Sequence, residues 1–321
     1  MDKRFNKLST VGDVLDEPLF SGFGRLMFPV DLNVSRSMTL AGLTGSGVYM
    51  WYSEFRAGTT VDVLNEFYLR AARGERIFYP IYSVEERRAD PEKENTGLFF
   101  MRGEPGAPFA VVNAGGGFYY VAAMHDSFPH CLVLSRRGLN AFALIYRPSS
   151  PWRDLARALC FIEDNAHELG VDPLGYSLWG GSAGARMAAA LGNRDNLERL
   201  TGRPCAGWRD VKTALRSGTG RGSGGASQLS GGMPQASAVI MEYTGYDQCS
   251  RADAPTYACV GTSDGIAWWQ GMRQRLETLS GLGIPTEFHS YPGLRHGFGI
   301  GTGTVAEGWP DDAIAFWREQ I

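Results

Sequence analysis

The sequence lacks several features that mark specialised classes of protein. No apolar run in its 321 residues approaches the roughly 18 that a transmembrane helix needs. The basic start, MDKRFNKLST, has no apolar stretch behind it, so we expect neither a membrane span nor a secretory signal. The 34 acidic and 31 basic residues nearly balance, which leaves no electrostatic basis for binding nucleic acid.

The cysteines and histidines lack the spacing of a disulfide framework or a metal site. The five cysteines are scattered without a Cys-x-x-Cys pair, and the five histidines show no metal-ligand spacing. We therefore expect no metal, no cofactor, and reduced cysteines in a cytoplasmic protein. The sequence leaves the oligomeric state open, with a homo-oligomer among the alternatives.

What the chain does contain is an alternation of strand-like and helix-like runs, which predicts a mostly parallel central sheet with helices on both faces. The expected strands are Ile77–Tyr82, Gly97–Arg102, Pro108–Asn113, Ala141–Arg147, Gly175–Gly181, Ala236–Tyr243, Thr256–Gly261 and Thr286–Tyr291. The expected helices are Thr60–Arg73, Ser127–Arg137, Pro151–Gly170, Ala183–Leu191, Ile266–Leu282 and Pro310–Gln320.

Two regions depart from this alternation. Residues 1–74 contain one convincing helix and otherwise glycine, serine and aromatic residues, so we interpret them as an N-terminal cap on a catalytic domain of residues 75–321. Residues 202–235 include SGTGRGSGGASQLSGG, which predicts a flexible, glycine-rich insertion. The charged stretch EERRADPEKEN, between the first two strands, is expected to be a loop.

The pattern G-x-S-x-G occurs twice. A serine on a sharp strand-to-helix turn needs small residues two positions away on each side. Ser182 has them in Gly180–Gly184, and Ser263 has them in Gly261–Gly265. We favour Ser182 as the nucleophile, because strands and acidic loops lie between it and His296, whereas Ser263 leaves no separate strand to carry an acid. The alternative for Ser182 is a tight glycine turn that packs helix on strand.

Three consecutive glycines close the strand PFAVVN and offer free backbone N–H groups to a developing oxyanion. We expect Gly116, Gly117 and Ala183 to donate to that oxyanion, and Gly115, Phe118 and His125 to line the substrate site. The alternative is a flexible strand end. A phosphate loop is disfavoured, since neither G-x-G-x-x-G nor G-x-x-x-x-G-K-[ST] spacing is present.

His296, on a glycine-flanked loop after the last strand, is the expected general base. His289 competes but lies inside the strand pattern. Asp264, at a strand end, is the expected acid that orients His296, although an aspartate there also suits a helix N-cap. Asp247 is the alternative acid.

These motifs together resemble the α/β-hydrolase esterases of the acetyl esterase/lipase group. GGGF at 115–118, GGSAGA at 180–185, GTSDG at 261–265 and RHGFG at 295–299 occur in that order. The bacterial acetylxylan and feruloyl esterase-like branch looks most similar, and the resemblance covers roughly residues 77–321. The family often has His or Pro where this chain has Ala114, and one branch has Asp where this chain has Gly181.

The resemblance implies an α/β-hydrolase fold and a serine esterase that takes a small-molecule ester with a short acyl group, such as an acetyl ester of a sugar. A peptidase or amidase with the same triad is one alternative. A non-catalytic binding protein on the same fold is another. A membrane-surface lipase is weakly supported, because no basic amphipathic stretch is present.

Overall fold

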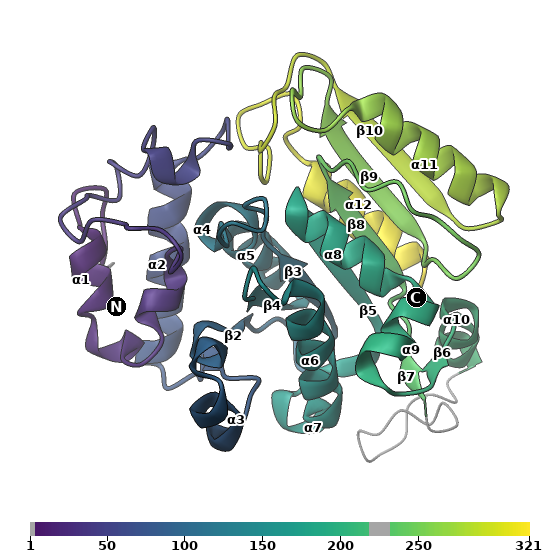
Figure 1. Ribbon diagram of the computed structural model, residues 1–321, viewed down its shortest axis with the longest axis horizontal. Coiled ribbons are helices and arrows are strands. Elements are labelled where there is room, and N and C mark those ends of the chain that lie inside the picture. Colours follow the sequence, from purple (N-terminus) through teal and green to yellow (C-terminus); the bar gives the residue numbers. More distant parts are fainter. Residues whose placement is uncertain (1–3, 218–231) are drawn as a thin grey trace.

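The computed structural model describes residues 4–217 and 232–321 (Figure 1). Their centre is an eight-stranded sheet in the order β1-β2-β4-β3-β5-β8-β9-β10. From β4 to β10 every neighbouring pair is parallel, and only the β1–β2 and β2–β4 pairs are antiparallel. The expected mostly parallel sheet is confirmed.

The strands are β1 Phe78–Tyr79, β2 Gly97–Met101, β3 Pro108–Asn113, β4 Asn140–Ile145, β5 Asp172–Gly181, β6 Cys205–Ala206, β7 Met233–Pro234, β8 Ala238–Glu242, β9 Thr256–Gly261 and β10 Thr286–Tyr291. The α-helices are α1 Val11–Leu15, α2 Ala57–Ala72, α3 Val84–Ala89, α4 Ala123–Asp126, α5 Phe128–Arg136, α6 Pro151–Asp164, α7 Ala166–Leu169, α8 Ala183–Gly192, α9 Arg194–Thr201, α10 Trp208–Ser217, α11 Trp269–Gly281 and α12 Trp309–Glu319. Short 3₁₀ helices are η1 Pro18–Phe20, η2 Gly24–Met27, η3 Gly47–Tyr49 and η4 Pro91–Asn95.

Helices cover both faces of the sheet, as expected. On one face, α8 packs on β3, β5 and β8 and also contacts α6 and α9. On the other, α5 packs on β2, β3 and β4 and contacts α12. Strands β2, β4 and β8 are buried along their whole length, because a sheet covered on both faces excludes water from both sides of each strand. Among the described residues, no helix is both long and apolar enough to cross a membrane.

The N-terminal segment lies at one end of the molecule, where α2 packs beside α4 and α5 (Figure 1). Its buried side chains join the same apolar cluster as those of the sheet rather than forming a second core. Phe23, for example, stacks on Phe78 with ring centroids 5.3 Å apart and meets Phe99 edge-on. This segment is therefore packed onto the sheet by direct aromatic contacts with strands β1 and β2.

Two local expectations are wrong. The stretch EERRADPEKEN is not a loop, because α3 and η4 occupy it; the Ser83 hydroxyl accepts the Glu86 N–H while the Glu86 carboxylate accepts the Ser83 N–H, a capping box that starts a helix too short to show periodicity. The first strand shrinks to Phe78–Tyr79, since Pro80 has no N–H to extend the pairing.

The glycine-rich insertion expected over 202–235 is also wrong for part of its length. Helix α10 occupies residues 208–217, and Trp208, Val211 and Ala214 bury one face of it at helical spacing. Strands β6, before α10, and β7, after it, pair with each other. The remainder of that expectation, residues 218–231, lies outside the described residues.

Candidate active site

The polar groups singled out in the sequence gather at one edge of the sheet. Asn113 ends β3, Ser182 follows β5, Asp264 follows β9, and His296 lies on the segment after β10. These strands are parallel, so their carboxyl ends share an edge. In open parallel sheets this is the edge at which ligands bind.

Ser182 occupies the turn between β5 and α8 in a strained conformation. Its φ is 52° and its ψ is −117°, a region that residues with a side chain rarely adopt. A Cβ at Gly180 would strike the backbone of Gly184, and a Cβ at Gly184 would strike the carbonyl of Asn113. Both glycines are therefore required sterically, because helix, strand and turn approach one another too closely for any side chain.

Ser182, His296 and Asp264 form a hydrogen-bonded chain. The Nδ1 atom of His296 lies 2.8 Å from Asp264 Oδ2, and its Nε2 atom lies 3.1 Å from Ser182 Oγ. With Nδ1 protonated and donating to the carboxylate, Nε2 is free to accept the serine proton. Both His296 and Asp264 are buried, which protects this chain of contacts from water.

Asp264 contacts His296 and also holds a local turn, but it is not the N-cap of α11. Its Oδ2 accepts from His296, while its Oδ1 accepts the N–H groups of Ile266 and Ala267 at 2.7 Å each. These bonds hold a turn outside the helix, so α11 begins at Trp269 and not at Ile266 as expected. The alternative acid, Asp247, is exposed and makes no hydrogen bond to His296.

The loop after β3 presents free donors beside the serine. Gly116 and Gly117 have φ values of 121° and 62°, and their N–H groups make no hydrogen bond to any described residue. Ala183 opens α8, so its N–H has no partner within the helix. A Cβ at Gly115 would lie 2.8 Å from Ser182 Cβ, so this glycine lets the loop lie directly against the nucleophile.

Phe118, expected at the substrate site, is half-buried beside that loop. Its φ is 60°, and its ring lies 5.2 Å from the ring of Trp152 and 6.4 Å from that of Tyr146. Phe118 therefore joins the oxyanion loop to the start of α6.

Asp126 holds the loop after β3 in place, and it was not identified from the sequence. Its Oδ2 accepts the N–H of Gly115 at 2.7 Å and faces the hydroxyl of Tyr52 at 3.5 Å, and its Oδ1 accepts the hydroxyl of Tyr243. The residue is completely buried. The available signal was that Asp126 is the only acidic residue between Glu104 and Asp154, because a buried charge requires partners.

Two contacts, one from Asp126 and one from Tyr146, account for the two departures from the resemblance. A Cβ at Gly181 would lie 2.5 Å from the Asp126 carboxylate, so that carboxylate already fills the space an aspartate before the serine would need. The loop itself is held at Ala114, whose carbonyl accepts the hydroxyl of Tyr146 at 2.8 Å.

The N-terminal segment contributes directly to the geometry of the site. The N–H of Ser53 donates to the carbonyl of His296 at 3.1 Å, and the Trp51 ring stacks on that of Tyr120 at 5.6 Å. Together with the hydroxyl of Tyr52 near Asp126, these contacts join the segment to both the histidine loop and the oxyanion loop.

His125, which we expected to line the substrate site, is buried against the loop that carries His296. Its Nε2 lies 3.0 Å from the carbonyl of Gly297. Burial lowers the pKa of His125 to about 4, so the ring is neutral near pH 7 and its Nε2–H donates to that carbonyl. The competitor His289 lies on β10, half-exposed, with Nε2 2.6 Å from Glu287 Oε1.

A buried His130–Glu242 pair lies beneath the nucleophile turn. Nε2 of His130 is 3.1 Å from Oε1 of Glu242, and the Glu242 carbonyl accepts the N–H of Ser182 at 3.0 Å. Burial raises the pKa of Glu242, and the Glu242 charge raises the pKa of His130 against the effect of burial. The pair thus fixes the end of β8, whose last residue accepts the N–H of Ser182. Among the described residues, no group of three or more His, Cys, Asp or Glu is arranged to hold a metal ion.

Comparisons with known proteins identify the fold. The sequence matches no protein-family model and no curated protein. The structure matches an acetyl ester-xyloside bifunctional hydrolase from Caldicellulosiruptor lactoaceticus, with a TM-score of 0.57 and 19% identity over 75% of this chain and 95% of that one. It matches propionate-bound esterase 2 from Thermogutta terrifontis with a TM-score of 0.56 and 20% identity, over 75% and 93%.

A third match is an α/β-hydrolase enzyme from a Medee basin deep-sea metagenome library, with a TM-score of 0.53 and 18% identity over 70% of this chain and 93% of that one. The chain therefore has the α/β-hydrolase fold, as the resemblance implied.

Proposed function

We propose that this protein is a serine hydrolase that cleaves carboxylic esters with short acyl groups through an acyl-enzyme. The observation that carries the proposal is the continuous chain from Ser182 Oγ through His296 to Asp264, at 3.1 and 2.8 Å, beside a loop with free N–H groups. A nucleophile, a base, an orienting acid and oxyanion donors are the groups that acyl transfer requires.

In this mechanism, His296 Nε2 removes the proton of Ser182 Oγ as that oxygen attacks the ester carbonyl. The N–H groups of Gly116, Gly117 and Ala183 stabilise the oxyanion that forms. His296 then gives its proton to the departing alcohol, and Asp264 stabilises the transient imidazolium. Water, activated by His296, attacks the acyl-enzyme and releases the acid.

The substrate class is supported by the names of the matched structures. One matched protein acts on acetyl esters, and another holds propionate, so short acyl groups on sugars or related alcohols are the first esters to try. The five cysteines are all unpaired in the structure, and the proposal places the protein in a reducing compartment, the cytoplasm.

A fluorophosphonate probe tests the nucleophile without a guess about substrate. We expect one adduct, mapped to Ser182 by mass spectrometry and absent from Ser182→Ala. No adduct on the wild-type protein would favour the non-catalytic alternative, and an adduct on Ser263 would show that the wrong turn was chosen. Turnover of acetyl esters but not of aminoacyl amides would separate the esterase from the peptidase or amidase.

A further inference from the structure

A cavity of about 540 Å³ lies on the face of the sheet that α8 covers. It is bounded by the start of α6, the outer face of α8, helix α9 and the loop after β8. The polar and aromatic side chains that line it include Trp152, Arg153, Asn196, Arg199, Tyr246 and Gln248. We call it the arginine pocket.

One wall of the arginine pocket contacts the loop that lies beside Ser182. Ala190, which lines the pocket, follows Ser182 by eight residues along α8, or about 12 Å at 1.5 Å per residue. Trp152, also in its wall, contacts Phe118 of the oxyanion loop. A short acyl group on Ser182 does not extend this far, so the alcohol portion of the ester is the part that would enter.

The charge of the pocket is of one sign. None of the described residues that line it is an aspartate or glutamate. The side chain of Arg153 makes no hydrogen bond or ion pair with any described residue, and Arg199 donates only to the amide oxygen of Asn196, at 3.2 Å. Unpaired guanidinium groups are the preferred partners of carboxylates and phosphates in proteins.

A third arginine, Arg186, lies between the arginine pocket and Ser182 along the chain. Arg186 lies four residues beyond Ser182 and four residues before Ala190, so Arg186 and Ala190 share a face of α8. It is exposed, its guanidinium lies beside Gly245, and it has no hydrogen-bond partner among the described residues. The neighbouring cavity across the loop differs, because Asp247 lines it and its Arg275 is paired with Asp253.

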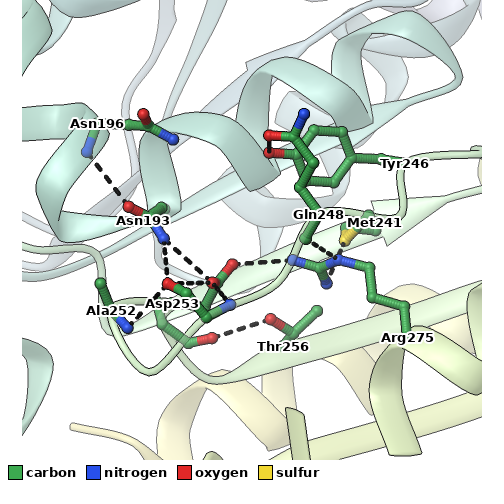
Figure 2. Close-up of polar contacts among 12 residues, drawn as sticks. Asn193, Asn196, Met241, Tyr246, Gln248, Ala252, Asp253, Thr256 and Arg275 are labelled. Atoms are coloured by element: carbon green, nitrogen blue, oxygen red, sulfur yellow. Dashed lines mark hydrogen bonds and ion pairs between the residues drawn. The ribbon is translucent and has the colours of Figure 1, made fainter. Parts of the chain in front are cut away.

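The wall between these two cavities is rigidly held. Figure 2 shows Arg275 reaching the carbonyl of Gln248 at 2.9 Å and the carboxylate of Asp253 at 2.9 Å. Asp253 in turn accepts from Asn193, whose side-chain oxygen accepts the N–H of Asn196 at 3.2 Å. The loop after β8 and the start of α9 are thus tied together, which preforms the pocket before any ligand enters.

We propose that the arginine pocket binds the alcohol portion of the ester, and that this portion is a sugar ring carrying an anionic group, either a carboxylate or a phosphate. The Trp152 indole would pack against the ring, the amides of Asn196 and Gln248 would meet its hydroxyl groups, and Arg153 and Arg199 would bind the anion. This inference rests on the proposed esterase function and specifies its substrate.

The first experiment compares acetylated methyl glucuronoside, acetylated methyl glucoside 6-phosphate and acetylated methyl glucoside as substrates. We expect kcat/KM for at least one anionic ester to exceed that of the neutral ester by about tenfold, the gain from roughly one net charge-assisted hydrogen bond. The preference should decrease as salt concentration rises. Equal kcat/KM for all three esters would overturn the proposal.

The double variant Arg153→Gln/Arg199→Gln tests the residues. We expect the ratio of anionic to neutral kcat/KM to fall to about one, mainly through a higher KM for the anionic ester. The matched control is Arg136→Gln, which removes an exposed charge from the last turn of α5 on the opposite face of the sheet and should retain the wild-type ratio. A double variant that keeps the preference would overturn the assignment.

A binding measurement separates this inference from the proposed function. Calorimetry with Ser182→Ala should show methyl glucuronoside or methyl glucoside 6-phosphate binding more tightly than methyl glucoside. If 4-nitrophenyl acetate is not hydrolysed and no fluorophosphonate adduct forms, the esterase proposal fails, while anion-selective binding still supports the pocket. If 4-nitrophenyl acetate is hydrolysed but neither turnover nor binding favours the anionic sugars, only the pocket proposal fails.

Discussion

Two turns of this chain carry the pattern G-x-S-x-G, and the fold uses them differently. In the first, Ser182 alone separates β5 from α8 and adopts a positive φ of 52°. In the second, residues 262–268 separate β9 from α11, and Ser263 is exposed without a positive φ. The same five-residue pattern therefore forms a sharp, strained turn in one place and an ordinary loop in the other.

The glycines explain the difference. Both glycines around Ser182 lie where a Cβ would strike backbone. Around Ser263, Gly261 is close to the carbonyl of Leu294 on the histidine loop, but a Cβ at Gly265 would have no neighbour within 4 Å. The second turn is tight only where it meets the histidine loop, and the side chain it supplies to the site is Asp264. Of the two turns, only the one at Ser182 is enclosed by helix and strand on both sides.

Replacing Ser182 with alanine should break the comparison most completely. We expect ester hydrolysis to fall by roughly 10⁴-fold or more, since no other group can form the acyl-enzyme. Activity would be measured with 4-nitrophenyl acetate, alongside thermal unfolding to show that the variant is folded. Residual activity within tenfold of the wild type would contradict the assignment.

Asp264→Asn tests the contribution of the second turn. An amide at this position cannot stabilise the imidazolium and favours the wrong tautomer of His296, so kcat should fall by about 10³–10⁴-fold. Asp247→Asn is the matched control, because Asp247 is exposed on the loop after β8. A larger loss from Asp247→Asn than from Asp264→Asn would reverse their roles.

Asp126→Asn tests a feature that, of the two turns, only the one at Ser182 has. There, the buried carboxylate of Asp126 packs against Gly181, whereas among the described residues no carboxylate is the nearest neighbour of the glycines around Ser263. Three donors point at this carboxylate, from Gly115, Tyr52 and Tyr243, and an amide group would turn a donor of its own toward one of them. We expect displacement of the oxyanion loop and a loss in kcat of about 10–100-fold with little change in KM. An unchanged kcat would limit Asp126 to a structural role.

His125→Gln tests the loop around His296, which contacts both serine turns through His296 and Leu294. The folded pKa of about 4 lies below the usual value near 6.5, so between these values the unfolded chain binds a proton that the folded chain does not. The free energy of unfolding should therefore fall by roughly 2 kcal/mol from this residue between pH 7 and pH 5.

In His125→Gln that part of the pH dependence should disappear, because glutamine does not titrate. Urea unfolding at the two pH values would measure it, with His289→Gln, a half-exposed histidine on β10, as the control. A variant whose stability still falls as steeply as that of the wild type would assign the pH dependence to other groups.

Ser263→Ala should have the smallest effect. The Ser263 side chain is exposed, and only its backbone N–H, bonded to the carbonyl of Leu294 at 3.0 Å, belongs to the site. We expect kcat/KM and stability to change by less than about twofold and 0.5 kcal/mol, respectively. A large loss of activity would show that the second turn contributes more than Asp264.

Sequence patterns predicted the sheet well because its strands are continuous apolar runs, as in PFAVVN of β3 and TYACVG of β9. Sequence patterns predicted less well where a helix boundary depends on one capping side chain or on a turn of a few residues. Helix α3 begins at a Ser83–Glu86 capping box, and α11 starts late because Asp264 holds Ile266 and Ala267 in a turn. Periodicity does not detect either feature, since each involves only a few residues.

The sequence by itself determined the α/β alternation, the two serine turns and the order of the serine, acid and histidine along the chain, because these depend on local spacing. Only the tertiary structure decided which buried groups serve the site. The contacts of Asp126 show this: it lies on α4, while Tyr52 comes from the N-terminal segment and Tyr243 directly follows β8. These residues meet only when the sheet is formed.

His125 is a second example. It contacts the carbonyl of Gly297, which lies 172 positions away in the sequence. Contacts over such separations follow from packing, which no local pattern encodes.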